Sequence, residues 1–332
     1  MRKPTTCPPL AQSVTLAAPT QGPGGARVAG QAGVISNKEP AMSIPFETKI
    51  DLKNPIWNRD AWARIQADLN PEKETICHCR GEVLGVKPGE AVKQLCNFET
   101  FLATRLIPQE DGTIRRLNKE VIFYTDPRSN QIIHEWTNPW TGEVVPVVHV
   151  FNDPFNYTIS EWLILAPEDF PKDGSKPEPR KIPLMFPWYP MGDDRLVLNT
   201  DMHLYYPNAL QPDKWPRESG GKMAQVSEMM RYIVKREDLE NPELTSVPMV
   251  GSWSRITPWL PWMLMGQTDG HCLYISTMTK SDNADIVPEH VREFSESQRP
   301  GMLQAPTEDY GPSISSLEYF AKEQTPAPPL KD

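Results

Sequence analysis

The chain has 332 residues, of which 39% are hydrophobic, and its formal net charge is −9. The charge is uneven, because residues 1–45 carry four basic and one acidic side chain while the remainder carries 30 basic and 42 acidic ones. An acidic body argues against a nucleic-acid partner. No apolar run approaches the roughly 18 residues of a membrane-spanning helix, so we expect no stable membrane insertion.

The proline content indicates the class of fold, and the cysteine content indicates the cellular compartment. The 36 prolines among 332 residues are about twice the usual share of ~5%. This proline content disfavours long helices and favours short strands joined by rigid loops. The five cysteines are odd in number and scattered, which indicates free thiols in a reducing compartment. We therefore expect a cytoplasmic protein.

Residues 1–45 contain no aromatic residue but five glycines and seven prolines. Such a segment cannot bury enough surface to offset its chain entropy, so we expect a disordered extension. Three further interpretations stay open. The first is a poor export signal, the second an organelle transit peptide, and the third a true start at Met42.

The hydrophobic pattern then predicts the elements in chain order. A helix is expected at 58–69 with Asn58 as its N-cap, and further helices at 288–297 and within 315–322. The strands are expected at 75–86, 94–107, 113–125, 131–136, 143–151, 157–165, 195–206, 222–235, 249–256 and 271–278. Residues 167–192 are proline-rich and predict an extended loop, and the tail from Thr325 is expected to be loose.

Two nearly identical turns occur at 125–133 and 137–145. Each has Asp or Asn followed by Pro, then a residue that tolerates positive φ (Asn130, Gly142), then β-formers. This is turn chemistry between antiparallel strands. The sequence therefore predicts a mainly β fold, an antiparallel β-barrel or strongly curved meander sheet, calycin- or lipocalin-like in outline, with a few short helices. We expect one such domain at 46–310 and a tail with a short helix at 311–332.

Three motifs carry a family resemblance. They are WPRESGG at 215–221, WTNPWTGE at 136–143 and PWLPWMLMG at 258–266. On the basis of these motifs, the chain from about residue 51 to residue 305 resembles the family known as domain of unknown function 1838. The resemblance implies no settled activity.

Glu228 is the most suggestive single residue, because it lies in the middle of the apolar face formed by Val226 and Met230. If this face points into a barrel, desolvation would raise the carboxyl pKa toward the range useful for acid/base catalysis. The alternative is a structural ion pair with an arginine such as Arg217.

Asp201, His203 and Tyr205 share one face of their strand, since residues i and i+2 point the same way. Asp201 could orient His203 as a general base, with Tyr205 nearby as an acid. The alternative is a solvated outer face.

The 215–221 loop places Trp215, Arg217 and Glu218 between Pro and Gly residues. Arg217 and Glu218 could clamp a ligand carboxylate or close the mouth of a barrel, with Trp215 as a wall. The alternative is a buried Arg–Glu corner that plugs the barrel end.

An aromatic and sulfur-rich patch supplies further candidate walls for a flat apolar ligand, and the alternatives are core packing or a membrane-touching loop. The patch contains Trp253, Trp259, Trp262 and Met265.

We expect no metal site, because strand alternation directs the His78 side chain away from those of Cys77 and Cys79. Dinucleotide, Walker, zincin and hydrolase motifs are missing, so we expect no cofactor.

These observations favour a cofactor-independent isomerase, dehydratase or cyclase acting on a small hydrophobic, oxygenated metabolite of polyketide or terpenoid type. Glu228, His203 and Asp201 would be catalytic, and the loop and patch residues would bind substrate. A non-catalytic binding protein is the first alternative, and a barrel filled by its own side chains is the second. A small hydrophobic metabolite is the expected partner, and a homodimer stays open.

Overall fold

Ten antiparallel strands form one large sheet in the computed structural model, which describes residues 44–165 and 180–329. The hydrogen-bonded order is β10-β11-β12-β13-β14-β1-β2-β3-β6, and β7 also pairs with β3. The mainly β class with few short helices is therefore confirmed. Within the described ranges the path of strands ends at β10 on one side and at β6 and β7 on the other. The sheet is open, and no closed barrel is detected.

The long strands follow the expected pattern closely. They are β1 (Thr75–Val86), β2 (Lys93–Pro108), β3 (Ile114–Thr125), β11 (Arg195–Pro207), β12 (Met223–Lys235), β13 (Val250–Thr257) and β14 (His271–Ser281). The short strands of the same sheet are β6 (Val150–Asn152), β7 (Tyr157–Ile159) and β10 (Trp188–Met191). Two separate hairpins pair β4 (Glu135–Thr137) with β5 (Val144–Pro146) and β8 (Trp162–Leu165) with β9 (Arg180–Pro183).

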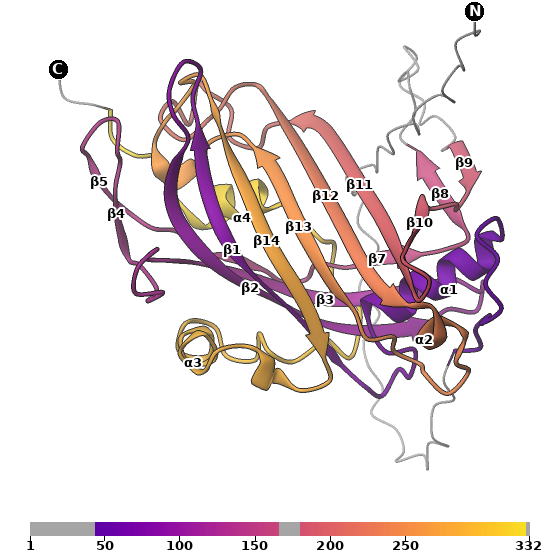
Figure 1. The fold of residues 1–332 in the computed structure, drawn as a ribbon. Helices are drawn as coiled ribbons and strands as arrows, with labels where there is room; N and C mark the ends of the chain where they lie inside the picture. The colour runs from indigo at the N-terminus through magenta and orange to yellow at the C-terminus, as the bar shows by residue number, and fades with distance from the viewer. Residues whose placement is uncertain (1–43, 166–179, 330–332) are drawn as a thin grey trace, which may run out of the picture.

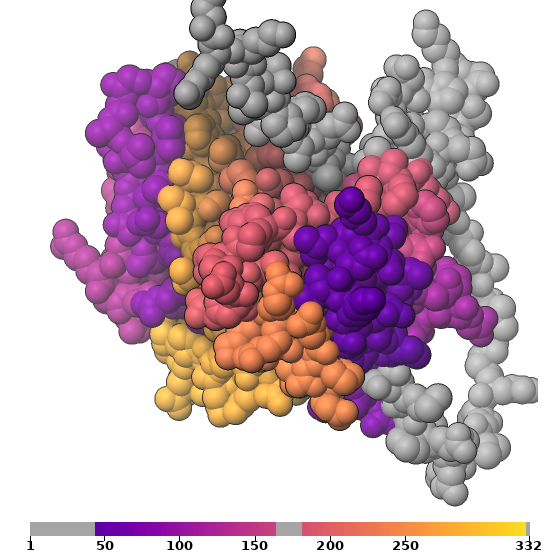
Figure 2. Space-filling view, turned by 45° about the vertical axis from the view of Figure 1, so that its right-hand side comes forward, coloured from indigo at the N-terminus to yellow at the C-terminus, as the bar shows by residue number. Residues whose placement is uncertain are grey.

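Short helices surround the sheet. They are α1 (Pro55–Gln66), α2 (Arg236–Glu240), α3 (Glu289–Gln298) and α4 (Ser316–Glu323), with 3-10 turns η1 (Pro261–Met263) and η2 (Ala284–Ile286). In Figure 1, β11 to β14 run side by side while β2 and β3 bend beneath them, and α4 lies behind the sheet. Figure 2 shows α1 in indigo beside the rose chain of β10 and the orange chain around α2. Trp57 of α1 packs against Trp188 of β10 there, with ring centroids 5.2 Å apart.

The first helix begins four residues earlier than expected. Asn54, not Asn58, is the N-cap, because its Oδ1 accepts the N–H of Ile56 at 2.9 Å and Pro55 occupies the first helical position. A proline at this position costs no hydrogen bond. Asn58 is buried instead, and its Oδ1 accepts the indole N–H of Trp188 at 2.8 Å.

The twin turns form as predicted and share one hydrogen-bond pattern. Asn130 N–H donates to Asp126 O at 2.9 Å, and Gly142 N–H donates to Asn138 O at 2.8 Å. Both Asn130 (φ 57°) and Gly142 (φ 73°) adopt the left-handed conformation. The strands around them are shorter than expected: β4 pairs with β5, the end of the expected 143–151 strand forms β6 against β3, and Ile132 makes a single bridge with Thr125.

Two expected loops differ from the structure. The 167–192 segment is not an extended loop throughout, since β9 and β10 form after residue 179. Residues 166–179 lie outside the described part, as do residues 1–43.

The tail after Thr325 was expected to be loose, but it is hydrogen-bonded to the 215–221 loop. Ala327 N–H donates to Glu218 Oε1 at 2.5 Å, and Pro328 O accepts from Arg217 Nη1 at 3.1 Å.

Candidate functional site

The concave face of the sheet and helix α4 enclose a pocket of about 1510 Å³. This exceeds the roughly 300–1,000 Å³ of common ligand sites. It is also far larger than the cavity of a few waters that a filled interior would leave. Its walls come from β1, β2, β3, β6, β7 and β11 to β14, and α4 contributes Ser316 to Phe320.

Glu228 and Arg255 form the charged pair on one wall. They are direct cross-strand partners of β12 and β13, and Arg255 Nη1 lies 3.5 Å from Glu228 Oε1. The other carboxylate oxygen, Oε2, accepts the indole N–H of Trp253 at 3.1 Å. Both side chains border the pocket and are about one-fifth exposed, at 22% for Arg255 and 18% for Glu228.

Glu120 is a second carboxyl group in the pocket, contributed by β3. Burial raises the pKa of the Glu120 carboxyl to about 6, the Asn152 amide opposes this shift, and the charge of Glu228 adds to it. Asn152 Nδ2 donates to Glu120 Oε2 at 2.6 Å. A carboxyl group with this pKa is partly protonated near neutral pH and can serve as an acid.

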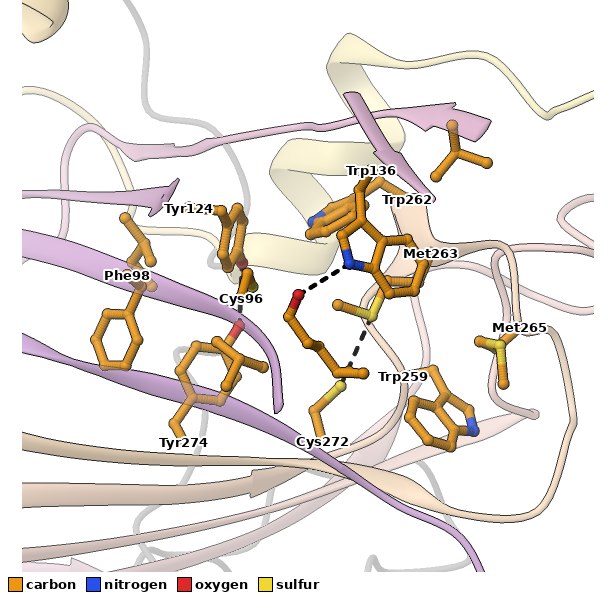
Figure 3. Packing of buried hydrophobic residues seen from close by; sticks show 14 residues of the cluster. Cys96, Phe98, Tyr124, Trp136, Trp259, Trp262, Met263, Met265, Cys272 and Tyr274 are labelled. Carbon is orange, nitrogen blue, oxygen red and sulfur yellow. Dashed lines mark hydrogen bonds between the residues drawn. The ribbon is translucent and has the colours of Figure 1, made fainter. Parts of the chain in front are cut away.

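The bend of the sheet brings these groups within range of one another. β3 and β13 are four strands apart in the sheet, about 19 Å across a flat surface, yet Glu120 interacts electrostatically with Arg255 and Glu228. A tyrosine pair lies beside them, with the Tyr124 and Tyr274 hydroxyls 3.0 Å apart and pointing toward one another (Figure 3). Burial raises the pKa of both phenols. Glu120, Glu228, Arg255 and the two tyrosines, here called the acid/base cluster, border one pocket and interact electrostatically.

Asp201 and His203 border this pocket, but strand alternation puts them on the face of the sheet opposite to Glu228 of β12. Met202, which is between them, is the direct cross-strand partner of Glu228. Asp201 accepts from Arg231 Nη1 at 2.5 Å, and His203 Nδ1 lies 2.9 Å from Ser227 Oγ. Each of the two therefore has its own partner on β12, and the structure shows no hydrogen bond from one to the other. Tyr205, on the same face, is 69% exposed.

The three predicted residues of the 215–221 loop have different surroundings. Glu218 is 4% exposed and borders the pocket, where its Oε2 has no hydrogen-bond partner in the described part of the chain. Arg217 pairs with Glu143 of the second turn. Trp215 is 1% exposed and packs on Phe320 of α4, with ring centroids 5.8 Å apart. Arg217 and Trp215 thus make structural contacts, while Glu218 both borders the pocket and binds the C-terminal segment.

Trp253, Trp259 and Trp262 all border the pocket. Figure 3 shows Trp259 and Trp262 beside Met263 and Met265 in one buried cluster. Met265 is packed in this core, where its Sδ lies 3.1 Å from Asn138 Nδ2. The three tryptophans therefore combine core packing with a pocket wall.

The two residues that the sequence reasoning missed are Glu120 and Arg255. Strand alternation puts Arg255 on the same face of its strand as Trp253, which was already a candidate wall residue. In β3, Glu120 shares its face with Ile122 and Tyr124, the pattern that singled out Glu228.

The Cys77–Cys79 segment alternates as predicted. Both thiols border the pocket, whereas His78 faces away and its Nε2 lies 2.7 Å from Glu99 Oε2. Within residues 44–165 and 180–329, no group of three His, Cys, Asp or Glu side chains is placed to hold a metal ion. In the same part of the chain, no helix is long and apolar enough to span a membrane.

The fold and site define a mainly β protein with a large, chiefly apolar pocket and a buried acid/base cluster. The chain belongs to the family described as "Protein of unknown function (DUF1838)", whose model matches residues 72–324. This confirms the resemblance carried by the three tryptophan-rich motifs. No curated protein matches the chain in the comparison made.

Proposed function

We propose that this protein is a cofactor-independent enzyme that moves protons on a small hydrophobic, oxygenated metabolite, as an isomerase, dehydratase or cyclase. The observation that carries the proposal is the meeting of Glu120, Glu228 and Arg255 in a pocket of about 1510 Å³. Two carboxyl groups in different environments can act as acid and base at one pH.

The chemistry needs only these groups. The Glu228 carboxylate removes a proton from a carbon next to a carbonyl, and the C–H electron pair becomes the enolate. Arg255 stabilises the charge that develops on the oxygen. The protonated Glu120 then gives a proton to another carbon in an isomerisation, or to a departing hydroxyl group, which leaves as water in a dehydration.

His203 with Asp201 remains the second candidate for a proton carrier. Both residues border the pocket, although each has another partner. The cluster around Glu120 is favoured, because the charges of Glu120, Glu228 and Arg255 interact directly.

One observation favours the alternative of a non-catalytic binding protein. Glu228 is paired with Arg255 and Trp253, and a carrier would hold its buried carboxylate in this way. A carrier would bind a metabolite and release it unchanged.

Deuterium exchange separates the two functions. The protein is incubated in D2O with a small-molecule extract of its host, and every compound that gains mass or disappears is recorded. An enzyme incorporates deuterium into a few compounds, and E228Q slows this by about 10²–10⁴-fold. R195Q, which changes a surface arginine at the start of β11, serves as the matched control. A carrier retains compounds without exchanging or consuming any.

A further inference from the structure

Arg116 is a buried cation that forms no ion pair in the described part of the chain. Its residue is 4% exposed, it borders the pocket from β3, and it makes no salt bridge there. Nη2 donates to Thr104 Oγ1 at 3.2 Å, Nε has no hydrogen-bond partner, and the guanidinium lies 4.8 Å from the centre of the Tyr157 ring. A buried charge without compensation is costly.

Arg64 shows how this fold satisfies a buried arginine that has a structural role. Its guanidinium donates to the carbonyl oxygens of Leu244, Leu239, Asp238 and Asn241 at 2.8–3.0 Å. In the described part of the chain Arg116 has a smaller set of acceptors, the hydroxyls of Thr104 and Tyr157, although it is almost equally buried.

The neighbours of Arg116 also have more donors than acceptors. Thr104 Oγ1 donates to Asn118 Oδ1 at 2.6 Å, and Asn118 Nδ2 is buried without a partner. Glu120 interacts with Arg116 electrostatically, but its Oε2 already accepts from Asn152. In the described part of the chain, this carboxyl group is engaged by Asn152 and makes no ion pair with the Arg116 guanidinium.

We infer that Arg116 anchors a ligand carboxylate, so that the pocket takes amphipathic carboxylic acids. Arginine binds carboxylates through two parallel N–H donors. Trp62, Ile65 and Cys77 border the same pocket. The inference deepens the proposed function and rests on it, since it requires that a small molecule enters the pocket.

This anchor orients the ligand. Arg116 and Glu120 are four residues apart on one face of β3, so their Cα atoms are about 13 Å apart. A molecule held at Arg116 extends its apolar body along β3 toward Glu120 and Glu228. The reacting atoms would thus be several bonds from the carboxylate, and the tryptophan walls would cover the far end.

Pyrenebutyric acid and pyrenebutanol test this anchor, because they share a flat apolar body and differ in the carboxylate. Their affinities are measured by fluorescence titration on full-length protein stripped of bound small molecules. We expect wild type to bind the acid at least tenfold more tightly than the alcohol. R116M should lose this preference, R116K should retain part of it, and the surface control R195Q should retain it fully.

A structural role for Arg116 would give another result. If the arginine only stabilised the fold, R116M would lower the melting temperature of the ligand-free protein; we expect that temperature to be unchanged or higher. Equal affinity of wild type for acid and alcohol, or a preference that survives in R116M, overturns the anchor but leaves the proposed pocket intact. Binding of neither probe overturns both.

Discussion

Glu228 and Arg255 face each other across β12 and β13, and this ion pair borders a pocket rather than solvent or a filled core. The strand register fixes the pair, while Trp253 holds the second carboxylate oxygen. Both oxygens of the Glu228 carboxylate therefore have partners on β13. The pair is therefore the structural centre of the proposed acid/base cluster.

Breaking this pair should cost stability. We expect E228Q and R255Q each to lower the free energy of unfolding by about 1–3 kcal/mol, below the ~3–5 of fully buried pairs because the pocket admits water. The double variant should lose less than the sum of the two, since it leaves no unpaired charge. Urea unfolding of the four proteins measures this coupling, and strictly additive losses would contradict the pairing.

Glu120 should give stability a distinct pH dependence. Its folded-state pKa of about 6 lies above the ordinary 4.5, so its favourable contribution is present below about pH 4.5 and is lost as the pH rises to about 6. E120Q removes this dependence. The unfolding free energy of E120Q relative to wild type should rise by about 1–2 kcal/mol between pH 4 and pH 7. If the difference in unfolding free energy between E120Q and wild type did not change with pH, Glu120 would not be the group responsible for this pH dependence.

The contact between Glu218 and the C-terminal segment should control local opening. E218A removes the acceptor of the Ala327 N–H, so exchange of this amide should accelerate by about ten- to hundredfold. E218Q keeps a carbonyl acceptor and should restore part of the protection. NMR of protein labelled at alanine nitrogen follows this one amide. Equal exchange in wild type and E218A would show that the segment is held by other contacts.

The second of the twin turns depends on Gly142, whose φ is 73°. A Cβ there meets open space, so the cost of G142A is conformational, about 1–2 kcal/mol. G142N should lose less, because asparagine tolerates the left-handed region. Thermal or urea unfolding compares the variants. An alanine that is harmless here would contradict the observed turn conformation.

Local pattern was sufficient for the long strands. β1 has the bounds that were predicted, and β12 differs by one residue at its start, because uninterrupted alternation between turns leaves little choice. The start of the first helix was predicted wrongly because its N-cap, Asn54, precedes Pro55 and lies before the first apolar residue of the helical repeat. Short strands such as β9 and β10 depend on tertiary pairing, which the sequence pattern does not encode.

The site was harder to predict for a related reason. Alternation shows that Glu228 shares a face with apolar residues, but it does not show which distant strand faces it. Glu120 of β3 and Glu228 of β12 border the same pocket although five steps separate their strands in the sheet. Asp201 and His203 had the spacing of a pair, yet their neighbours Arg231 and Ser227 on β12 are closer hydrogen-bond partners.

Native mass spectrometry of the protein purified from its own host tests the central claim most directly, which is that the pocket holds a small molecule. The account predicts about one bound metabolite per chain, and extraction should identify an apolar body bearing an acid group. A ligand-free mass that gains nothing from a host metabolite extract would contradict the account.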